Sequence, residues 1–236
     1  MTRPSTTPPL SCAGHTPAVV ISRRLSTIVL PQSLESPSHS KILSCALRKL
    51  YKHQATMPLI AQNPKDRVIL GLMTFGPDET TGARVTNFDE FQKHLDYFQR
   101  QGYDEVDTAR MYVGGKQEAW TRDAKWQDRG FTLATKVYPY EAGVHQPEKL
   151  KQHFNTSLKE LGADTVDIFY LHAPDRSVPF EETLGAVNEM HKEGKFVQLG
   201  LSNFAAWEVA EIYNICKERG WVKPTIYQAM YNAISG

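Results

Sequence analysis

Short apolar runs alternate with longer amphipathic segments from Val68 onward. The apolar runs predict strands near residues 68–73, 105–109, 131–136, 166–171, 197–201 and 225–230. Their starts lie 26 to 37 residues apart, which is the spacing of a repeated strand-helix unit. The run from Val166 to Leu171 is almost entirely apolar, as expected of a parallel strand that is covered on both faces. The pattern therefore predicts an α/β fold with a parallel sheet.

Four amphipathic segments between these runs predict helices. Asn87-Phe-Asp-Glu90 has the pattern of a capping box, and Pro147 suits the first turn of the next helix. In each segment apolar residues recur at spacings of three and four, and a glycine follows. The expected buried faces are Phe88, Phe91, Leu95 and Phe98 before Gly102; Leu150, Phe154, Leu158 and Leu161 before Gly162; Leu184, Val187 and Met190 before Gly194; and Val209, Tyr213 and Cys216 before Gly220.

Polar residues stand at the ends of three predicted strands. Asp107 lies where the second run ends, and Tyr112 follows five residues later; the third run ends in Lys136 and the fourth in His172. In a parallel α/β barrel, the side chains at the carboxyl ends of successive strands converge on one mouth. The sequence thus predicts that these four residues form a single site.

The four residues resemble the catalytic tetrad of the aldo-keto reductases. Three further segments carry the resemblance, which covers roughly residues 58–236: Leu70-Gly-Leu-Met73, Gly200-Leu-Ser-Asn-Phe204 and Tyr227-Gln-Ala-Met-Tyr-Asn232. Within the family the chain is most similar to the aflatoxin-aldehyde-reductase branch. The resemblance implies a TIM (β/α)8-type barrel, of which about six βα units are present, because a complete barrel needs about 250 residues. We therefore expect residues 57–236 to be an incomplete aldo-keto reductase domain.

The resemblance also implies a reaction and a role for each residue. The expected activity is NADPH-dependent reduction of aldehydes or ketones to alcohols, with Tyr112 as the proton donor. Lys136 would lower the pKa of the phenol, which is about 10 when unperturbed, and Asp107 would keep Lys136 charged and in place. His172 would orient the substrate oxygen and stabilise the charge that develops on it.

A cofactor site follows from the same resemblance. Ser202, Asn203 and Gln228 would hold the nicotinamide carboxamide, Met73 would line the side of the nicotinamide ribose, and Asp107 would also contact the cofactor. The choice of NADP(H) over NAD rests on the resemblance alone. No Gly-x-Gly-x-x-Gly motif occurs, which agrees with a cofactor bound outside the Rossmann scheme.

Residues 1–56 differ in composition from the rest of the chain. They are rich in Ser, Thr and Pro and hold seven Lys or Arg residues against the single acid Glu35. This composition predicts a disordered leader. It is also typical of a mitochondrial transit peptide, and the alternative is upstream sequence joined to a protein that begins at Met57. We expect a cytoplasmic location, or a mitochondrial one if the leader is a transit segment.

Charge and composition limit the kinds of binding partner that the chain is expected to have. Residues 57–236 hold 20 of the 27 bases and 25 of the 26 acids, and this mildly acidic balance does not support nucleic-acid binding. No run approaches 18 apolar residues, so no membrane span is expected. The expected partner is a small-molecule carbonyl substrate, with a possible homodimer.

Three function classes remain open. The first is the reductase, with the further expectation that two absent barrel units leave strand edges open and impair this chain or make it an inactive fragment. The second is a non-catalytic relative, such as the potassium-channel β-subunit. The third is a metal-dependent hydrolase, but the sequence predicts no metal site, because its histidines form no paired set at strand ends: His145, His153, His172 and His191.

Overall fold

The computed structural model describes residues 21–23 and 66–234. Its strands are β1 (Ile21–Arg23), β2 (Asp66–Gly71), β3 (Glu105–Asp107), β4 (Thr132–Val137), β5 (Val166–Leu171), β6 (Phe196–Ser202) and β7 (Pro224–Gln228). Its α-helices are α2 (Phe88–Arg100), α3 (Gln117–Asp123), α4 (Pro147–Leu161), α5 (Phe180–Lys192) and α6 (Ala206–Arg219), with short 3-10 turns η1 (Glu79–Thr81) and η2 (Tyr112–Gly115).

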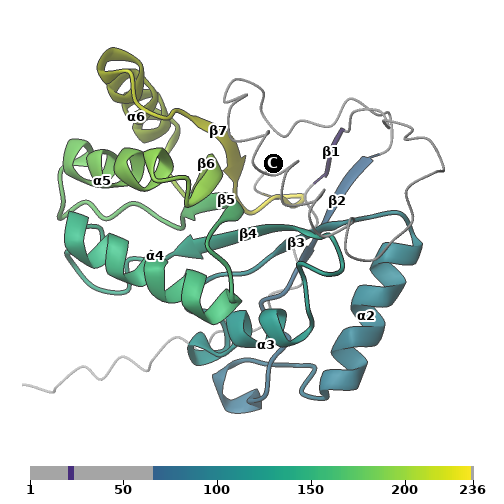
Figure 1. Cartoon of the computed structure of the whole chain (residues 1–236). Coiled ribbons are helices and arrows are strands. Elements are labelled where there is room, and N and C mark those ends of the chain that lie inside the picture. Colours follow the sequence, from purple (N-terminus) through teal and green to yellow (C-terminus); the bar gives the residue numbers. More distant parts are fainter. Residues whose placement is uncertain (1–20, 24–65, 235–236) are drawn as a thin grey trace, which may run out of the picture.

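Strands β2 to β7 form a parallel sheet in chain order. Figure 1 shows the sheet curving, with the helices along its outer side. This arrangement confirms the predicted α/β class and the partial barrel of six βα units. Among the described residues the sheet does not close, since β1 and β7 are its two edges. The register places Gly71 beside Asp107 and Ser202 beside Gln228, so the carboxyl ends of the strands lie at one end of the sheet.

The main core lies between the sheet and the helices. Phe154 of α4 packs on Phe169 of β5 with ring centroids 4.2 Å apart. The predicted helix signals are confirmed at two starts: the Asn87 side chain accepts a hydrogen bond from Glu90 N–H at 2.9 Å, and Pro147 occupies the first turn of α4. The predicted faces of α4 and α5 are buried, and that of α2 is buried except for the partly exposed Phe88.

The predicted face of α6 is wrong at one position. Ile212 is fully buried, whereas Tyr213 is 42% exposed and lies near the Lys223 ammonium. Val209 and Cys216 fit a helical stripe with either residue, because spacings of three and four both return to the same face. The aliphatic side chain occupies the core, and the larger ring with its hydroxyl group stays at the surface.

A small second cluster lies on the inner face of the sheet. It consists of Ala134, Ile168 and Tyr170, with Ile226 packed against them. Gly200 on β6 makes room for this cluster, because a Cβ atom there would lie 2.3 Å from the Tyr170 ring. The inner face is therefore filled by one large aromatic ring beneath the mouth.

Of residues 1–56, the structure describes only Ile21–Arg23. They form β1, which pairs antiparallel with β2 and aligns Ile21 with Val68. The expectation of a disordered leader over residues 1–56 stays a prediction. The rest of the leader lies outside the described residues. In the described ranges, no helix is long and apolar enough to cross a membrane.

Candidate active site

Lys136 lies at the centre of the predicted site. Its side chain is fully buried, and its Nζ lies 2.5 Å from Asp107 Oδ2, 2.8 Å from the Thr108 carbonyl and 3.3 Å from the Tyr112 hydroxyl. Strands β3 and β4 are paired neighbours, so Asp107 and Lys136 face the same end of the sheet. The structure therefore joins a carboxylate, an ammonium and a phenol through one buried cation.

His172 completes the group from the end of β5. Its ring stands perpendicular to the rings of Tyr112 and Tyr138, with centroids 5.8 and 5.4 Å away, and its backbone N–H donates to the Val137 carbonyl at 3.0 Å. The four residues predicted to form one site thus lie together. Tyr138 was not predicted; it follows β4 directly, which is the one signal that could have marked it.

Burial and charge oppose each other at this site. Burial acts to lower the pKa of Lys136, but attraction to Asp107 and Tyr112 leaves that pKa above its ordinary value. Burial raises the pKa of the Tyr112 phenol, and the Lys136 ammonium opposes this only in part. Lys136 thus acts on the phenol in the expected direction, but desolvation outweighs the ammonium and the net pKa of Tyr112 lies above its ordinary value. Tyr112 is protonated at neutral pH.

His172 is uncharged at neutral pH. Burial, with a smaller contribution from the Lys136 charge, lowers its pKa to about 3. A neutral imidazole carries one N–H donor and one acceptor nitrogen. Two buried atoms at this site, His172 Nδ1 and Asp107 Oδ1, have no hydrogen-bond partner in the part of the chain that is described. Both atoms can therefore form a hydrogen bond with a bound ligand.

The residues expected to hold a nicotinamide lie at the ends of β6 and β7. Ser202 is buried, and Asn203 has a left-handed backbone with φ of 61°. The Asn203 N–H donates to the Gln228 carbonyl at 3.2 Å, while its Nδ2 donates to the His172 carbonyl at 2.9 Å and to Ser202 Oγ at 3.0 Å. Met73, 39% exposed, follows β2. These hydroxyl and amide groups, together with the free Asp107 and His172 atoms, fit a polar ligand such as a nicotinamide.

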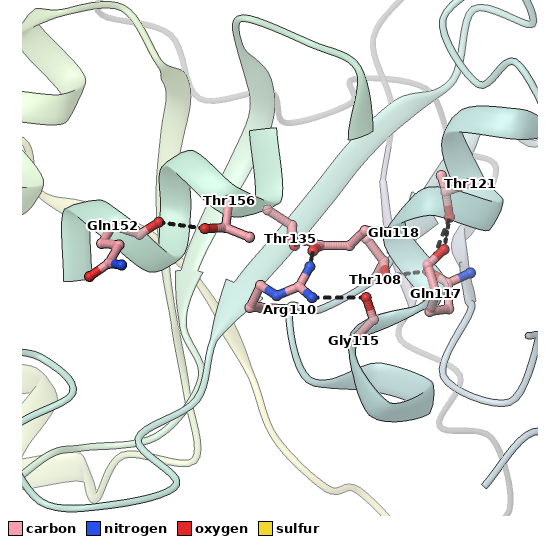
Figure 2. A network of polar contacts seen from close by, with 9 residues as sticks. All are labelled: Thr108, Arg110, Gly115, Gln117, Glu118, Thr121, Thr135, Gln152 and Thr156. Carbon is pink, nitrogen blue, oxygen red and sulfur yellow. Dashed lines mark hydrogen bonds and ion pairs between the residues drawn. The ribbon is translucent and has the colours of Figure 1, made fainter. Parts of the chain in front are cut away.

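A buried polar network beside Tyr112 was not predicted (Figure 2). Glu118 of α3 is fully buried; one of its carboxylate oxygens pairs with Arg110, and the other accepts a hydrogen bond from Thr135 Oγ1 at 2.7 Å. The Arg110 guanidinium also donates to the Gly115 carbonyl at 2.8 Å. The signal available in the sequence was the pair Gly114-Gly115 two residues after Tyr112, which is typical of a tight loop.

Comparison with known proteins agrees with this fold. Residues 67–235 match the model of the aldo/keto reductase family. Human aflatoxin B1 aldehyde reductase member 2 is 47% identical over 195 residues, which are 80% of this chain and 52% of that protein, and human member 4 is 44% identical over 171 residues, or 70% and 49%. The chain thus spans about half the length of these relatives.

Comparison with solved structures also finds an aldo-keto reductase. The thermostable aldo-keto reductase Tm1743, in complex with the inhibitor epalrestat, is 26% identical with a TM-score of 0.56, covering 72% of this chain and 61% of that one. The parallel sheet, with its polar group at the strand ends, is of the α/β-barrel class. Within that class, the chain belongs to the aldo/keto reductase family.

In residues 21–23 and 66–234, no group of three or more His, Cys, Asp or Glu side chains is placed to hold a metal ion.

Proposed function

We propose that the chain acts as an NADPH-dependent reductase of small aldehydes or ketones, with Tyr112 as the proton donor. The observation that carries the proposal is the buried contact series from Asp107 through Lys136 to Tyr112, with neutral His172 beside it. Relatives named aflatoxin B1 aldehyde reductase support the substrate class.

The first task of these residues is to bind and orient the carbonyl oxygen. His172 is neutral, so its N–H can donate a hydrogen bond to that oxygen without placing a second cation beside Lys136. When bound, the reduced nicotinamide would supply the hydride. Ser202, Asn203 and Gln228 would hold its carboxamide, and Met73 and Asp107 would line the ribose side.

The second task is to deliver a proton to the oxygen. Tyr112 holds that proton at neutral pH, because burial keeps its pKa high. An alkoxide is a much stronger base than a phenolate, so the phenol is a competent acid once negative charge develops on the substrate oxygen. The phenolate left behind lies 3.3 Å from the Lys136 ammonium, which stabilises it in a site that excludes much of the water. Asp107 keeps Lys136 charged throughout.

One observation favours a second candidate, a chain that binds but turns over poorly. Strand β7 is an edge of the described sheet, and the residues after it are exposed, with Tyr231 at 82% and Ile234 at 97%. The cofactor side of the mouth is therefore walled less completely than the Tyr112 side. A binding protein of the aldo/keto reductase type would share the four residues without appreciable turnover.

The test is a reduction assay on the full chain with NADPH and an aromatic aldehyde. The expected result is loss of absorbance at the nicotinamide band with formation of equimolar alcohol, unaffected by a metal chelator. NADPH binding detected by fluorescence, without alcohol formation, would instead support the binding protein. Activity abolished by chelator and restored by a metal would contradict the proposal.

A further inference from the structure

We infer that Arg110 and Glu118 are positioning residues that hold the Tyr112 hydroxyl against Lys136. The inference rests on the proposed function only in that Tyr112 is taken as the proton donor. Neither side chain belongs to the group formed by Asp107, Tyr112, Lys136 and His172. Their role would be to fix the loop that carries the phenol.

Arg110 and Glu118 contact each other, and both are hydrogen-bonded to strand β4 on either side of the loop that carries Tyr112. The Arg110 backbone N–H donates to the Lys136 carbonyl at 2.9 Å, and its guanidinium reaches forward to Gly115 and Glu118. Glu118 then returns to β4 through Thr135, the residue before Lys136. Figure 2 shows Glu118 between Arg110 and Thr135. The chain segment that leaves β3 is thus bonded to Lys136 and the one that enters α3 to the adjacent Thr135, and Tyr112 lies between these two contacts in the sequence.

The backbone after Tyr112 needs such a support. Val113, Gly114 and Gly115 all have positive φ angles, of 50°, 60° and 82°. A β-branched residue in this region is strained, and such strain persists only where the surroundings impose it. The buried Val113 side chain is held under Gly76, where a Cβ atom would lie 2.7 Å from it. A loop in this conformation has alternatives of lower local energy, so fixing Tyr112 requires contacts from outside the loop.

The Arg110 guanidinium occupies the space that a side chain on Gly115 would need. A Cβ atom on Gly115 would lie 2.4 Å from Arg110 Nη2, so any other residue would displace the guanidinium from the Gly115 carbonyl. A second set of buried hydrogen bonds also joins the two ends of the loop. Thr108 Oγ1 donates to Gln117 Oε1, and Thr121 Oγ1 donates to the same oxygen at 3.0 Å. Both ends of the loop are therefore clamped by buried polar contacts.

Stability alone does not explain a buried ion pair at this place. The Glu118 side chain is 0% exposed, and burial raises the pKa of its carboxyl group while Arg110 and Thr135 oppose that rise. Apolar residues of similar volume often replace buried pairs with no loss of stability. Apolar residues cannot fix the orientation of their partners, whereas the hydrogen bonds of a guanidinium and a carboxylate do so. The pair therefore points to positional control of the loop.

The test uses Glu118→Gln and Arg110→Lys in the full chain, with Lys116→Gln as the matched control. Lys116 lies on the same loop but forms an exposed pair with Asp78. Arg110→Lys keeps the charge beside Glu118 but cannot reach both Glu118 and the Gly115 carbonyl, and it is the milder variant should Glu118→Gln fail to fold. The probe is fluorine NMR of chains labelled with 3-fluorotyrosine, in which the Tyr112 signal is the one lost in Tyr112→Phe. Fluorination lowers the pKa of a phenol and brings its titration into a milder pH range.

In both variants we expect the Tyr112 titration midpoint to move by about half a pH unit or more, because its distances to Lys136 and to solvent change together. Where the wild type turns over aldehyde, kcat should fall about tenfold to a hundredfold with KM nearly unchanged. Lys116→Gln should change neither quantity. A Tyr112 midpoint unaltered in a folded Glu118→Gln or Arg110→Lys chain would overturn the inference, whatever happens to kcat. A wild type without turnover refutes the proposed function, and the titration then decides the positioning role alone.

Discussion

The two walls of the mouth are built very differently. One wall, which we call the acid-base wall, consists of Asp107, Arg110, Tyr112, Glu118 and Lys136; Lys136 and Glu118 are fully buried and Asp107 is 6% exposed. The other, the edge wall, consists of Ser202, Asn203 and residues 224–234, where Tyr227 is 47% exposed and Tyr231 82%. Asp107 and Lys136 of the acid-base wall lie on strands with a neighbour on each side, whereas β7 has a neighbour on one side only among the described strands.

The buried wall suits the charges that it holds. An ammonium and a carboxylate interact strongly only where water is largely excluded, which demands burial and fixed partners. The hydroxyl and amide groups of Ser202 and Asn203 carry no full charge, so they tolerate water better. The comparison teaches that, among the described residues, the charged groups of the site lie in the covered middle of the sheet and its uncharged polar groups lie toward β7.

The largest effect should come from removing the buried cation with Lys136→Met. Asp107 would then be a buried carboxylate without a counter-charge, and the free energy of unfolding should fall by about 3–5 kcal/mol. Urea unfolding measures it. Lys116→Met removes a lysine from an exposed pair with Asp78 on the loop after Tyr112, and its fall should be far smaller. Equal falls in the two variants would mean that Lys136 is not buried as described.

Acid should destabilise the fold through His172. Its folded pKa of about 3 lies below the unfolded value of 6.5, so the unfolded chain takes up the proton first as the pH falls. The stabilisation from neutral His172 is thus complete above pH 6.5 and is lost toward pH 3, by about 2 kcal/mol at pH 5.

His145 adds to the same slope, because burial lowers its pKa to about 4. Unfolding free energies measured between pH 4.5 and pH 7.5 should therefore rise with pH. His172→Gln and His145→Gln should each flatten the curve, and the double variant should flatten it most. A slope unchanged in the double variant would show that neither histidine is buried in its neutral form.

The smallest effect concerns the inner face beneath the mouth. Gly200→Ala places a methyl group 2.3 Å from the Tyr170 ring, and such overpacking should lower stability by about 1–3 kcal/mol. Gly71→Ala on β2 is the control, since nothing lies within 4 Å of its Cβ position. Thermal unfolding of both variants gives the comparison, and a Gly200→Ala chain as stable as Gly71→Ala would mean that Tyr170 does not fill this space.

Periodicity alone predicted the strands and most of the helix faces. It succeeded because burial of a sheet between helices leaves a direct trace in the order of apolar residues. It failed at Ile212 and Tyr213, where two adjacent apolar residues fit the same stripe and only the room available in the core separates them.

The site was predictable in its members but not in its supports. Asp107, Lys136 and His172 each end a strand, so topology brings them together. The tie between Arg110, Glu118 and Thr135 depends on the left-handed turn at Val113, a residue whose type disfavours that conformation. The sequence indicated the effect of Lys136 on the Tyr112 pKa but not the larger, opposing effect of burial, because the depth of burial depends on packing around the loop.

The most direct test of the account is Tyr112→Phe in the full chain, with aldehyde reduction and NADPH affinity measured on the same sample. In the proposed function the acid-base wall donates the proton and the edge wall holds the carboxamide, so kcat should fall about 10²- to 10⁴-fold while the Kd for NADPH stays nearly unchanged. Tyr97→Phe, at an exposed position on α2, should alter neither value. Near-normal aldehyde reduction by folded Tyr112→Phe would contradict the account.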